Sequence, residues 1–433
     1  MPRLLITADD FCRSLQKSSA FFIWHHFEIL GGLSMLFSLS LILIIGFSLS
    51  GILNRFKIPG LIGLIFTGII LGPQGLNLIS PDILGISKDL REIALIVILL
   101  RAGLTLDLKD LKKVGRPALF MSFLPATFEI TAVTLLAPPL LGVTYIEALI
   151  MGAVLSAVSP AVVVPRMIHL MESGYGKKKR IPQMVLAGAS VDDIYVIILF
   201  TAFMGLYKGT AMSAGVLLSV PVAVLSGLLL GIICGVIMVR VFRLLHIRDT
   251  IKVLIILSAA FLFVTFEDFV SPILPLSGLL AVMALGGTIL KSNENLAKRL
   301  LGKFSKIWVG AEILLFVLVG AAVEIRALSG VGLSSVILIL SALLFRTAGV
   351  FLSLLKTELS LKEKLFTAIA YLPKATVQAA IGTIPLSQGV TAGNTILSVA
   401  VLAIVITAPL GAAGIDHLHK KLLVREKERQ SLG

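Results

Sequence analysis

Long apolar segments separated by short polar loops run through almost the whole chain. Judged by the length needed to cross a bilayer, they predict about thirteen transmembrane helices. These span residues 35–53, 58–71, 92–106, 117–141, 146–170, 181–207, 211–239, 251–267, 275–290, 307–323, 333–355, 365–384 and 395–415. The segments exceed the roughly ten residues of a barrel strand and show no two-residue alternation. The pattern therefore predicts an all-α polytopic membrane protein.

The composition supports the same class. Of the 433 residues, 57% are hydrophobic and 14% are charged, and the mean hydropathy is +1.02. Soluble proteins carry roughly 25% charged residues, so this chain is expected to be embedded in a membrane. Cys12 and Cys234 lie far apart, and the six histidines form no HExxH motif. We therefore expect no disulfide framework, no metal enzyme and no resident cofactor.

Basic residues gather in alternate loops, near positions 109–116, 177–180, 240–252, 291–306, 356–364 and 420–429. This is the positive-inside pattern, so the net charge of +14 indicates loop placement and not binding to nucleic acid. It predicts a cytoplasmic C-terminus with a basic tail at residues 417–433. Residues 1–33 hold a short apolar stretch interrupted by His25, His26 and Glu28, which predicts a surface helix or an extra crossing.

Two adjacent carboxylates, Asp192 and Asp193, lie in the middle of the apolar segment 181–207. A charged group at mid-membrane costs about 2.5–3.5 kcal/mol on insertion scales, so the pair is expected to have a function. A proton or a small cation can neutralise a carboxylate at that depth. Antiport requires at least that a proton and a cation compete for the same carboxylate. The alternative is that both carboxylates are held in structural salt bridges.

Two other segments are interrupted near mid-membrane. The first contains Ser159-Pro160 and Pro165, and the second contains Pro373-Lys374 followed by Thr376. A proline frees carbonyls of the preceding turn, and carbonyls that line a cavity can coordinate a cation. The alternatives are a plain proline kink and, for Lys374, extension of the side chain toward the cytoplasmic side.

The segments form two sets of six around the seventh, with the interruption in the fifth member of each set and one charge in the fourth. The two charges are Glu129 and Arg346. Because a single crossing links the sets, they run in opposite senses, and such inverted repeats are typical of secondary transporters. Arg346 is expected to pair with Glu129 or with Asp192, and the sequence leaves both open. Arg101 is a further candidate for the same charge network, or it extends toward the basic loop that follows it.

Four motifs in order along the chain resemble the monovalent cation/proton antiporter superfamily, and most closely sodium/hydrogen exchanger subfamily B and its bacterial relatives. The motifs are Ala-Val-Ser-Pro-Ala-Val-Val-Val-Pro (157–165), Ala-Ser-Val-Asp-Asp-Ile (189–194), Phe-Arg-Thr (345–347) and Leu-Pro-Lys-Ala-Thr-Val-Gln-Ala-Ala-Ile-Gly (372–382). The similarity extends from about Leu33 onward. It implies two broken, crossing helices at an ion site and a homodimer in the bacterial inner (plasma) membrane.

The resemblance also implies a division of labour between domains. A dimerisation domain is expected at 34–110 and 246–325, a mobile core domain at 111–207 and 326–416, and a linker helix at 208–245. Transport would follow elevator-type alternating access, in which the core moves past the dimerisation domain.

By the same resemblance, Asp193 matches the family's principal cation and proton ligand, and Asp192 matches its partner. Ser159 and Pro160 occupy the unwound crossing where other branches carry Thr-Asp, so a carboxylate is missing there. Arg346 stands where electrogenic relatives carry lysine. Relatives with arginine there resemble this chain in having a glutamate at the Glu129 position, and it pairs with the arginine.

The leading hypothesis is therefore exchange of Na⁺ (or Li⁺) for H⁺, with Asp193 and Asp192 as the metal ligands. The alternatives are a K⁺/H⁺ antiporter and a Na⁺-coupled symporter of an organic anion. No enzyme is expected, because adjacent carboxylates on one helix give poor geometry for activating a shared water. The expected partners are membrane lipid, monovalent cations, protons and a second copy of the chain.

Overall fold

The computed structural model describes residues 34–56, 58–105, 115–209, 214–245, 247–270, 275–323 and 325–425. Within these ranges the elements are helices, apart from one isolated β-bridge between Tyr175 and Arg425. The all-α class predicted from the sequence is confirmed. The predicted N-terminal segment 1–33 and the lysines of the predicted loop at 109–113 lie outside the described residues.

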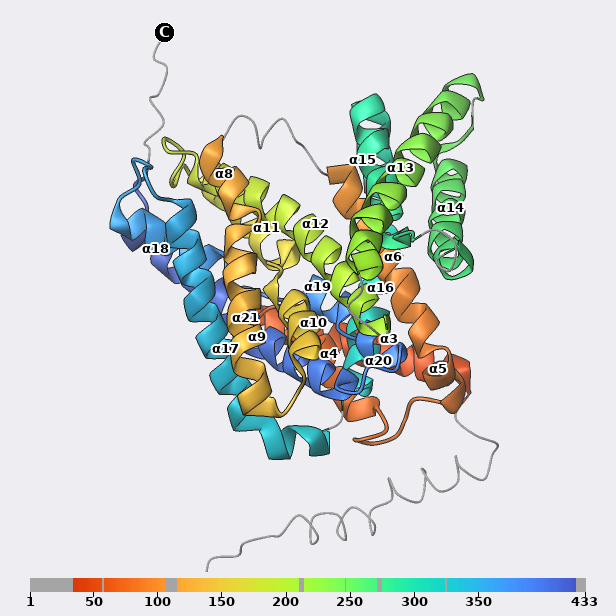
Figure 1. The fold of residues 1–433 in the computed structure, drawn as a ribbon, viewed down its shortest axis with the longest axis horizontal. Coiled ribbons are helices and arrows are strands. Elements are labelled where there is room, and N and C mark those ends of the chain that lie inside the picture. The colour runs from red at the N-terminus through yellow and green to blue at the C-terminus, as the bar shows by residue number, and fades with distance from the viewer. Residues whose placement is uncertain are drawn as a thin grey trace, which may run out of the picture.

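The helices form two groups that pack mainly among themselves (Figure 1). The first, here the α6 group, contains α3 (Met35–Arg55), α4 (Gly60–Leu71), α5 (Pro81–Gly85), α6 (Ser87–Thr105), α13 (Ala214–Leu244), α14 (Asp249–Val270), α15 (Gly278–Ser292) and α16 (Glu294–Ala321). The second, here the α12 group, contains α8 (Arg116–Met121), α9 (Leu124–Leu141), α10 (Tyr145–Ser156), α11 (Pro160–Glu172), α12 (Ile181–Lys208), α17 (Ile325–Ser353), α18 (Leu361–Ala370), α19 (Thr376–Ile381), α20 (Ile384–Ser387) and α21 (Gly393–Leu422).

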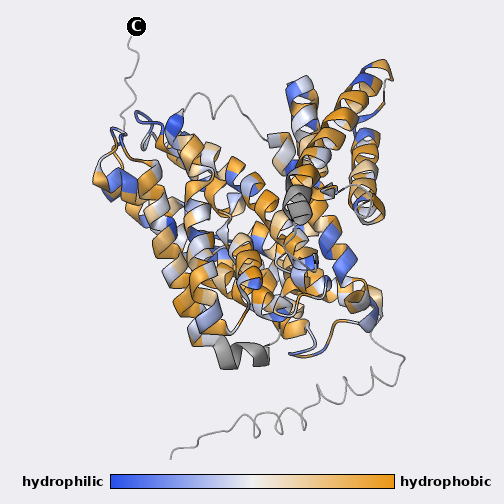
Figure 2. Cartoon of the chain, in the orientation of Figure 1, coloured by the Kyte–Doolittle hydropathy of each residue, from blue (hydrophilic) through white to orange (hydrophobic). Residues whose placement is uncertain are grey.

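Nine helical stretches in the described part of the chain are long and apolar enough to cross a membrane, and α4 and α15 are shorter apolar helices. Figure 2 shows hydrophobic residues along most of the length of the helices, and many of them are exposed. On α14, for example, Leu254, Leu262 and Phe269 are exposed. In water such a surface would be unfavourable, whereas lipid tails solvate it. The protein is therefore an integral, multi-pass membrane protein.

Each of the thirteen predicted segments contains helix within its described residues, and the two predicted interruptions are present between α10 and α11 and between α18 and α19. One further break separates α8 from α9 at residues 122–123, inside a segment predicted to be continuous. Pro125 explains it, because this residue has no N–H to donate to the carbonyl four positions earlier. Proline is tolerated in the first turn of a helix, so a new helix begins at Leu124.

Several helices extend further toward the basic loops than hydropathy predicts. α16 begins at Glu294, where the Asn293 side chain caps the Leu296 N–H at 3.0 Å, instead of near residue 307. α18 begins with a capping box formed by Ser360 and Glu363. Basic residues in these outer turns are good helix formers, and only the apolar part of each helix has to lie in the hydrocarbon. Hydropathy therefore located the membrane-embedded part and missed the helix ends.

Within the α6 group, α4 and α16 approach closely through glycines. A Cβ added at Gly320 would collide with the carbonyl oxygen of Ile65, and one added at Gly68 would collide with that of Val317. Small residues that allow such close backbone contact are a common means of helix association in membranes. The backbones of α4 and α16 are therefore in direct contact.

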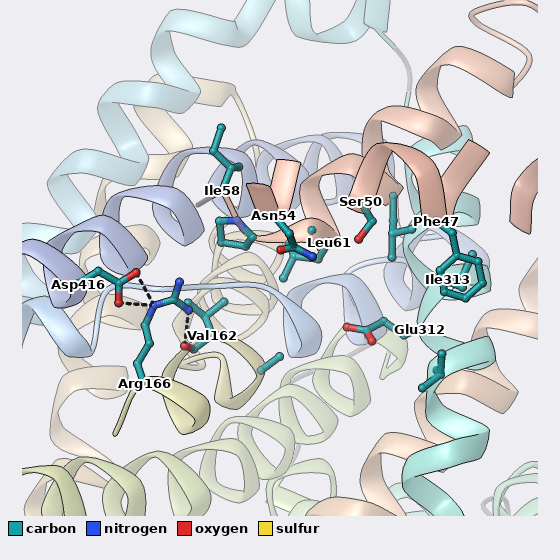
Figure 3. Close-up of a pocket in the computed structure, with 15 residues that line it drawn as sticks. Phe47, Ser50, Asn54, Ile58, Leu61, Val162, Arg166, Glu312, Ile313 and Asp416 are labelled. Carbon is teal, nitrogen blue, oxygen red and sulfur yellow. Dashed lines mark hydrogen bonds and ion pairs between the residues drawn. The ribbon is translucent and has the colours of Figure 1, made fainter. Parts of the chain in front are cut away.

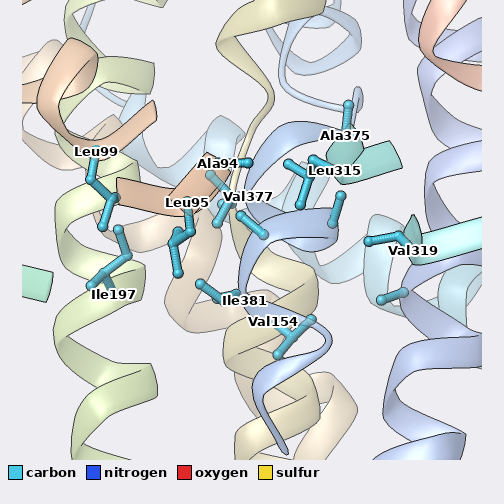
Figure 4. Packing of buried hydrophobic residues seen from close by; sticks show 14 of the residues in the cluster. Ala94, Leu95, Leu99, Val154, Ile197, Leu315, Val319, Ala375, Val377 and Ile381 are labelled. Atoms are coloured by element: carbon cyan, nitrogen blue, oxygen red, sulfur yellow. The ribbon is translucent and has the colours of Figure 1, made fainter. Parts of the chain in front are cut away.

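The two groups meet along an apolar interface. In Figure 4, Leu95 and Leu99 of α6 and Leu315 of α16 lie near Val377 and Ile381 of α19. These side chains are all buried. Dispersion contacts hold such a surface together without directional hydrogen bonds.

Candidate ion-binding site

Two interrupted helices meet inside the α12 group. Residues 157–159 separate α10 from α11, and residues 371–375 separate α18 from α19. The Ser159 N–H donates to the Pro373 carbonyl at 2.8 Å, which joins the two interruptions directly. Pro160 occupies the first turn of α11, where its missing N–H leaves no helical bond unmade. The two halves of the sequence therefore touch at the positions that proline chemistry predicted.

The end of α10 is capped by side chains from the opposite half of the chain. Lys374 Nζ donates to the Leu155 carbonyl at 2.5 Å, and Gln378 Nε2 donates to the Ala157 carbonyl at 2.8 Å. The last carbonyls of a helix lack backbone partners and carry partial negative charge, so a cation and an amide N–H are suitable caps. Carbonyls that the interruption frees are thus bound by protein donors in this structure.

Glu129 of α9 binds two cationic side chains at once. Arg346 Nη1 donates to Glu129 Oε2 at 2.7 Å, and Lys374 Nζ lies 2.7 Å from Glu129 Oε1. All three side chains are at most 1% exposed. Charged groups this deeply buried persist only when they are paired and hydrogen-bonded. Arg346 Nη1 also donates to the Ser156 carbonyl, and Arg346 Nε donates to the Tyr371 carbonyl at 2.6 Å.

Arg346 contacts both Glu129 and Asp192, the two carboxylates between which the sequence could not decide. Besides Glu129, its Nη2 lies 3.3 Å from Asp192 Oδ2. The same Asp192 oxygen accepts the Val158 N–H at 2.9 Å, which connects α12 to the extended residues of the crossing. Asp192 is fully buried. One of its two carboxylate oxygens is therefore held by an arginine and a backbone donor.

Asp193 differs from its neighbour in having no such restraint. It is buried, at 6% exposure, and makes no ion pair within the described residues. Its Oδ1 has no hydrogen-bond partner there. An ionised carboxylate without a partner is strongly disfavoured in such surroundings, so Asp193 requires a proton or a cation.

Three further oxygens near the crossing lack hydrogen-bond partners in the part of the chain described. They are Asp192 Oδ1, Ser159 Oγ and Thr376 Oγ1, and all three are buried. Hydroxyl and carboxylate oxygens are the ligands that hard cations prefer. Ser159 adjoins Val158, whose N–H binds Asp192, so the hydroxyl lies on the segment that contacts α12.

The structure does not bring Arg101 to the other charged residues. Arg101 lies on α6, in the other helix group, and its guanidinium stacks on the Trp308 ring of α16 with 5.4 Å to the centroid. Stacking on an aromatic face is favourable for arginine, so the side chain has an environment of its own.

Tyr371 and Gly188 belong to the site, and sequence reasoning missed them. The Tyr371 ring lies 5.5 Å from the Arg346 guanidinium, and a Cβ added at Gly188 would collide with the Tyr371 hydroxyl. Gly188 stands four positions before Asp192, so the two occupy one face of α12. The four-residue spacing between Gly188 and Asp192 could have indicated this contact, because a glycine one turn from a buried acid allows another segment to approach closely.

A cavity of about 470 Å³ lies between the two helix groups beside the crossing (Figure 3). Ala161 and Val162, which follow Pro160 in α11, form part of its wall, and other wall residues come from α3, α4, α16 and α21. α11 and α21 end next to basic segments of the sequence, and α3 ends at Arg55. The cavity therefore lies on the basic-loop side of the crossing.

The sequence and the fold are both similar to known transporters. A family profile described as "Sodium/hydrogen exchanger, transmembrane" matches residues 38–421. Human sodium/hydrogen exchanger 9B2 is 36% identical over 388 residues, covering 84% of this chain and 70% of the human protein. Human sodium/hydrogen exchanger 9B1 is 33% identical over 358 residues, covering 78% of this chain and 67% of that protein.

The solved structure of the sodium proton antiporter MjNhaP1 from Methanocaldococcus jannaschii at pH 8 has a TM-score of 0.74 with this fold. It is 22% identical, and the match covers 89% of this chain and 97% of that one. This likeness concerns the fold. The sequence matches, which run through nearly all of the described helices, show that the chain belongs to the sodium/hydrogen exchanger family of membrane transporters.

Proposed function

We propose that this protein exchanges Na⁺ (or Li⁺) for H⁺ across the membrane, with Asp193 binding the two ions in turn. The observation that carries the proposal is the contrast between the neighbouring acids. Asp192 is held by Arg346 and a backbone N–H, whereas Asp193 makes no ion pair within the described residues. A carboxylate without a permanent counter-charge can release one cation only by taking up another, which is the requirement for antiport.

The unpartnered oxygens supply the remaining ligands in this proposal. Asp192 Oδ1, Ser159 Oγ and Thr376 Oγ1 would complete the coordination of the metal ion, as hydroxyl and carboxylate oxygens suit a small hard cation. Glu129, Arg346 and Lys374 have a structural role, since they hold the two interruptions together.

The second part of the proposal concerns movement. The α12 group would slide past the α6 group, with α13 as the linker, because buried apolar side chains such as Leu95 of α6 and Val377 of α19 meet between the groups, and dispersion contacts do not fix one register. The resemblance to the antiporter superfamily supports a homodimer through the α6 group and a bacterial inner-membrane location. The basic loops support a cytoplasmic C-terminus. The human relatives show that the family is not confined to bacteria.

The proposal is tested in membrane vesicles that hold an imposed pH gradient, reported by a pH-sensitive dye. Addition of Na⁺ or Li⁺ should dissipate the gradient in vesicles with the wild-type protein and leave it intact with Asp193→Asn. Glu358→Gln, which neutralises an exposed carboxylate, is the matched control and should behave as wild type. Exchange retained by Asp193→Asn would refute the assignment.

Transport assays in the same vesicles distinguish the alternatives. Dissipation by K⁺ and not by Na⁺ or Li⁺ would indicate a K⁺/H⁺ antiporter. Uptake of a labelled organic anion driven by Na⁺ would indicate a symporter, which membership of the sodium/hydrogen exchanger family does not favour. Repeating the Na⁺ measurement with an imposed voltage gives the charge moved per cycle.

Movement between the groups is tested with a cysteine pair that joins α6 to α19, placed in a variant without Cys12 and Cys234. Cross-linking should stop exchange, and a reductant should restore it. Full exchange in the cross-linked protein would rule out sliding at this interface.

A further inference from the structure

The cavity beside the crossing has a different charge on each wall. On the α12-group wall, Arg166 Nε lies 3.1 Å from Asp416 Oδ1 and 3.2 Å from Oδ2, and Arg166 Nη1 donates to the Val162 carbonyl at 2.9 Å. This ion pair, in which one guanidinium nitrogen contacts both carboxylate oxygens, neutralises Asp416. Figure 3 shows Glu312 on the opposite wall, across the cavity from Arg166 and Asp416. Glu312 comes from α16 of the α6 group.

Glu312 has no direct basic partner within the described residues. Trp308, one turn earlier on α16, donates a hydrogen bond to its carboxyl, and Arg101 attracts it electrostatically. Arg101 stacks on the Trp308 ring and makes no ion pair with Glu312. Since Asp416 on the opposite wall is already paired with Arg166, Glu312 is the carboxylate among the described cavity residues that remains available to a mobile cation.

We infer that Glu312 is a cation-capture residue, which binds the incoming monovalent cation in the cavity before it reaches Asp193. This inference rests on the proposed exchange function. The cavity of about 470 Å³ is far larger than the roughly 10–15 Å³ of such space that one water needs, so a cation fits with its hydration shell. A carboxylate at the wall of a low-dielectric cleft raises the local concentration of cations.

Arg101 limits the affinity of Glu312 for a cation. An ion on a transport path must bind well enough to enter and weakly enough to leave. The positive charge of Arg101, which stacks on the Trp308 ring, weakens cation binding at Glu312. It does not neutralise the Glu312 carboxylate, because the two side chains form no direct ion pair. Arg101 and Glu312 therefore act together in the α6 group, away from the Glu129 network.

The inference predicts an effect that depends on the side of the membrane. The cavity lies on the side of the crossing where α21 ends at Leu422, so Glu312 serves cations that arrive from that side. In sealed vesicles of each orientation, scored by protease access to a C-terminal tag, the apparent KM for Na⁺ is measured. For Na⁺ presented on the C-terminal side, Glu312→Gln should raise KM by about three- to tenfold with little change in maximal rate.

Three comparisons separate cation capture from a structural role. For Na⁺ presented on the other side, Glu312→Gln should leave KM unchanged. Glu312→Asp should keep most of the wild-type affinity. An inert salt should shrink the difference between wild type and Glu312→Gln, because the Debye length is only about 8 Å at 0.15 M ionic strength. The control is Asp89→Asn, which neutralises an exposed acid in the first turn of α6, at the other end of that helix from Arg101.

An unchanged KM in Glu312→Gln on the C-terminal side would overturn the inference, as would an equal rise on both sides. Failure of the exchange proposal looks different, because the wild-type protein itself would then show no Na⁺-dependent dissipation of the pH gradient.

Discussion

Lys374 Nζ lies 2.7 Å from Glu129 Oε1, although the two residues stand 245 positions apart in the chain. The same carboxylate binds Arg346, and Arg346 reaches on to Asp192. Two buried bases therefore face two buried acids, and the network is balanced without Asp193. This balance leaves Asp193 as the acid whose counter-charge must come from an ion, which is why the exchange proposal places the ion there.

Glu129→Gln should destabilise the protein more than Asp192→Asn does. The first substitution leaves two buried cations facing a neutral amide, and breaking a buried pair in this way costs about 3–5 kcal/mol. The second keeps an oxygen for the Val158 N–H and removes only the 3.3 Å contact with Arg346. Thermal unfolding of the two variants in detergent, at one protein concentration, checks this, and equal shifts in Tm would contradict it.

Gly188→Ala should destabilise the protein through a specific collision. The new methyl group would meet the Tyr371 hydroxyl, and overpacking a tight site costs about 1–3 kcal/mol. Tyr371→Phe should cost little by itself, since this hydroxyl is buried without a hydrogen-bond partner in the described residues. The double variant should recover part of the loss. Thermal unfolding of the four proteins gives the coupling, and strictly additive effects would argue against the collision.

Gly320→Ala and Gly310→Ala should have opposite effects although both lie on α16. Alanine is about 1 kcal/mol better than glycine inside a helix, so Gly310→Ala, with no atom within 4 Å of the new methyl group, should be neutral or stabilising. At Gly320 the methyl group collides with the Ile65 carbonyl and should push α4 away. The yield of monodisperse protein in size-exclusion chromatography measures this. A Gly320→Ala variant as well behaved as Gly310→Ala would exclude the close contact.

The Glu363 carboxyl should contribute stability that acid removes. Burial by itself raises its pKa, but hydrogen bonds from Lys179 at 2.8 Å and from the Ser360 N–H at 2.7 Å outweigh burial, so the pKa lies below its ordinary value. A carboxyl with a lowered pKa in the folded state stabilises fully above its unfolded pKa of about 4.3, and the contribution disappears as the pH falls through the folded pKa.

Glu363→Gln should therefore lower Tm at pH 7, by an amount equivalent to about 1 kcal/mol, because the acceptor loses its charge and the ion pair with Lys179 is lost. The difference from wild type should shrink as the pH falls below about 4.3. A difference that stays constant between pH 7 and acid pH would show that the charge of Glu363 contributes nothing.

Local chemistry in the sequence was sufficient to locate the helices and their two main interruptions. Hydropathy and helix-breaking proline act over a few neighbouring residues, so their effects can be read without the fold. The acid pair Asp192–Asp193 could be singled out for the same reason, because its position in the middle of an apolar segment indicates its depth, and charge at that depth is costly. Proline also explains the unpredicted break before Leu124, once its place in the first turn is known.

Only the tertiary structure decided which charges meet. Arg346 was expected to pair with either Glu129 or Asp192, and in the structure it contacts both. Lys374, from the other half of the chain, forms an ion pair with Glu129. Arg101 stacks on Trp308 in the other helix group. Such pairings depend on distances between segments far apart in sequence, which periodicity and composition do not encode. The residues of the proposed ion site could thus be singled out from local sequence, and the absence of an ion-pair partner for Asp193 among the described residues was decided by packing.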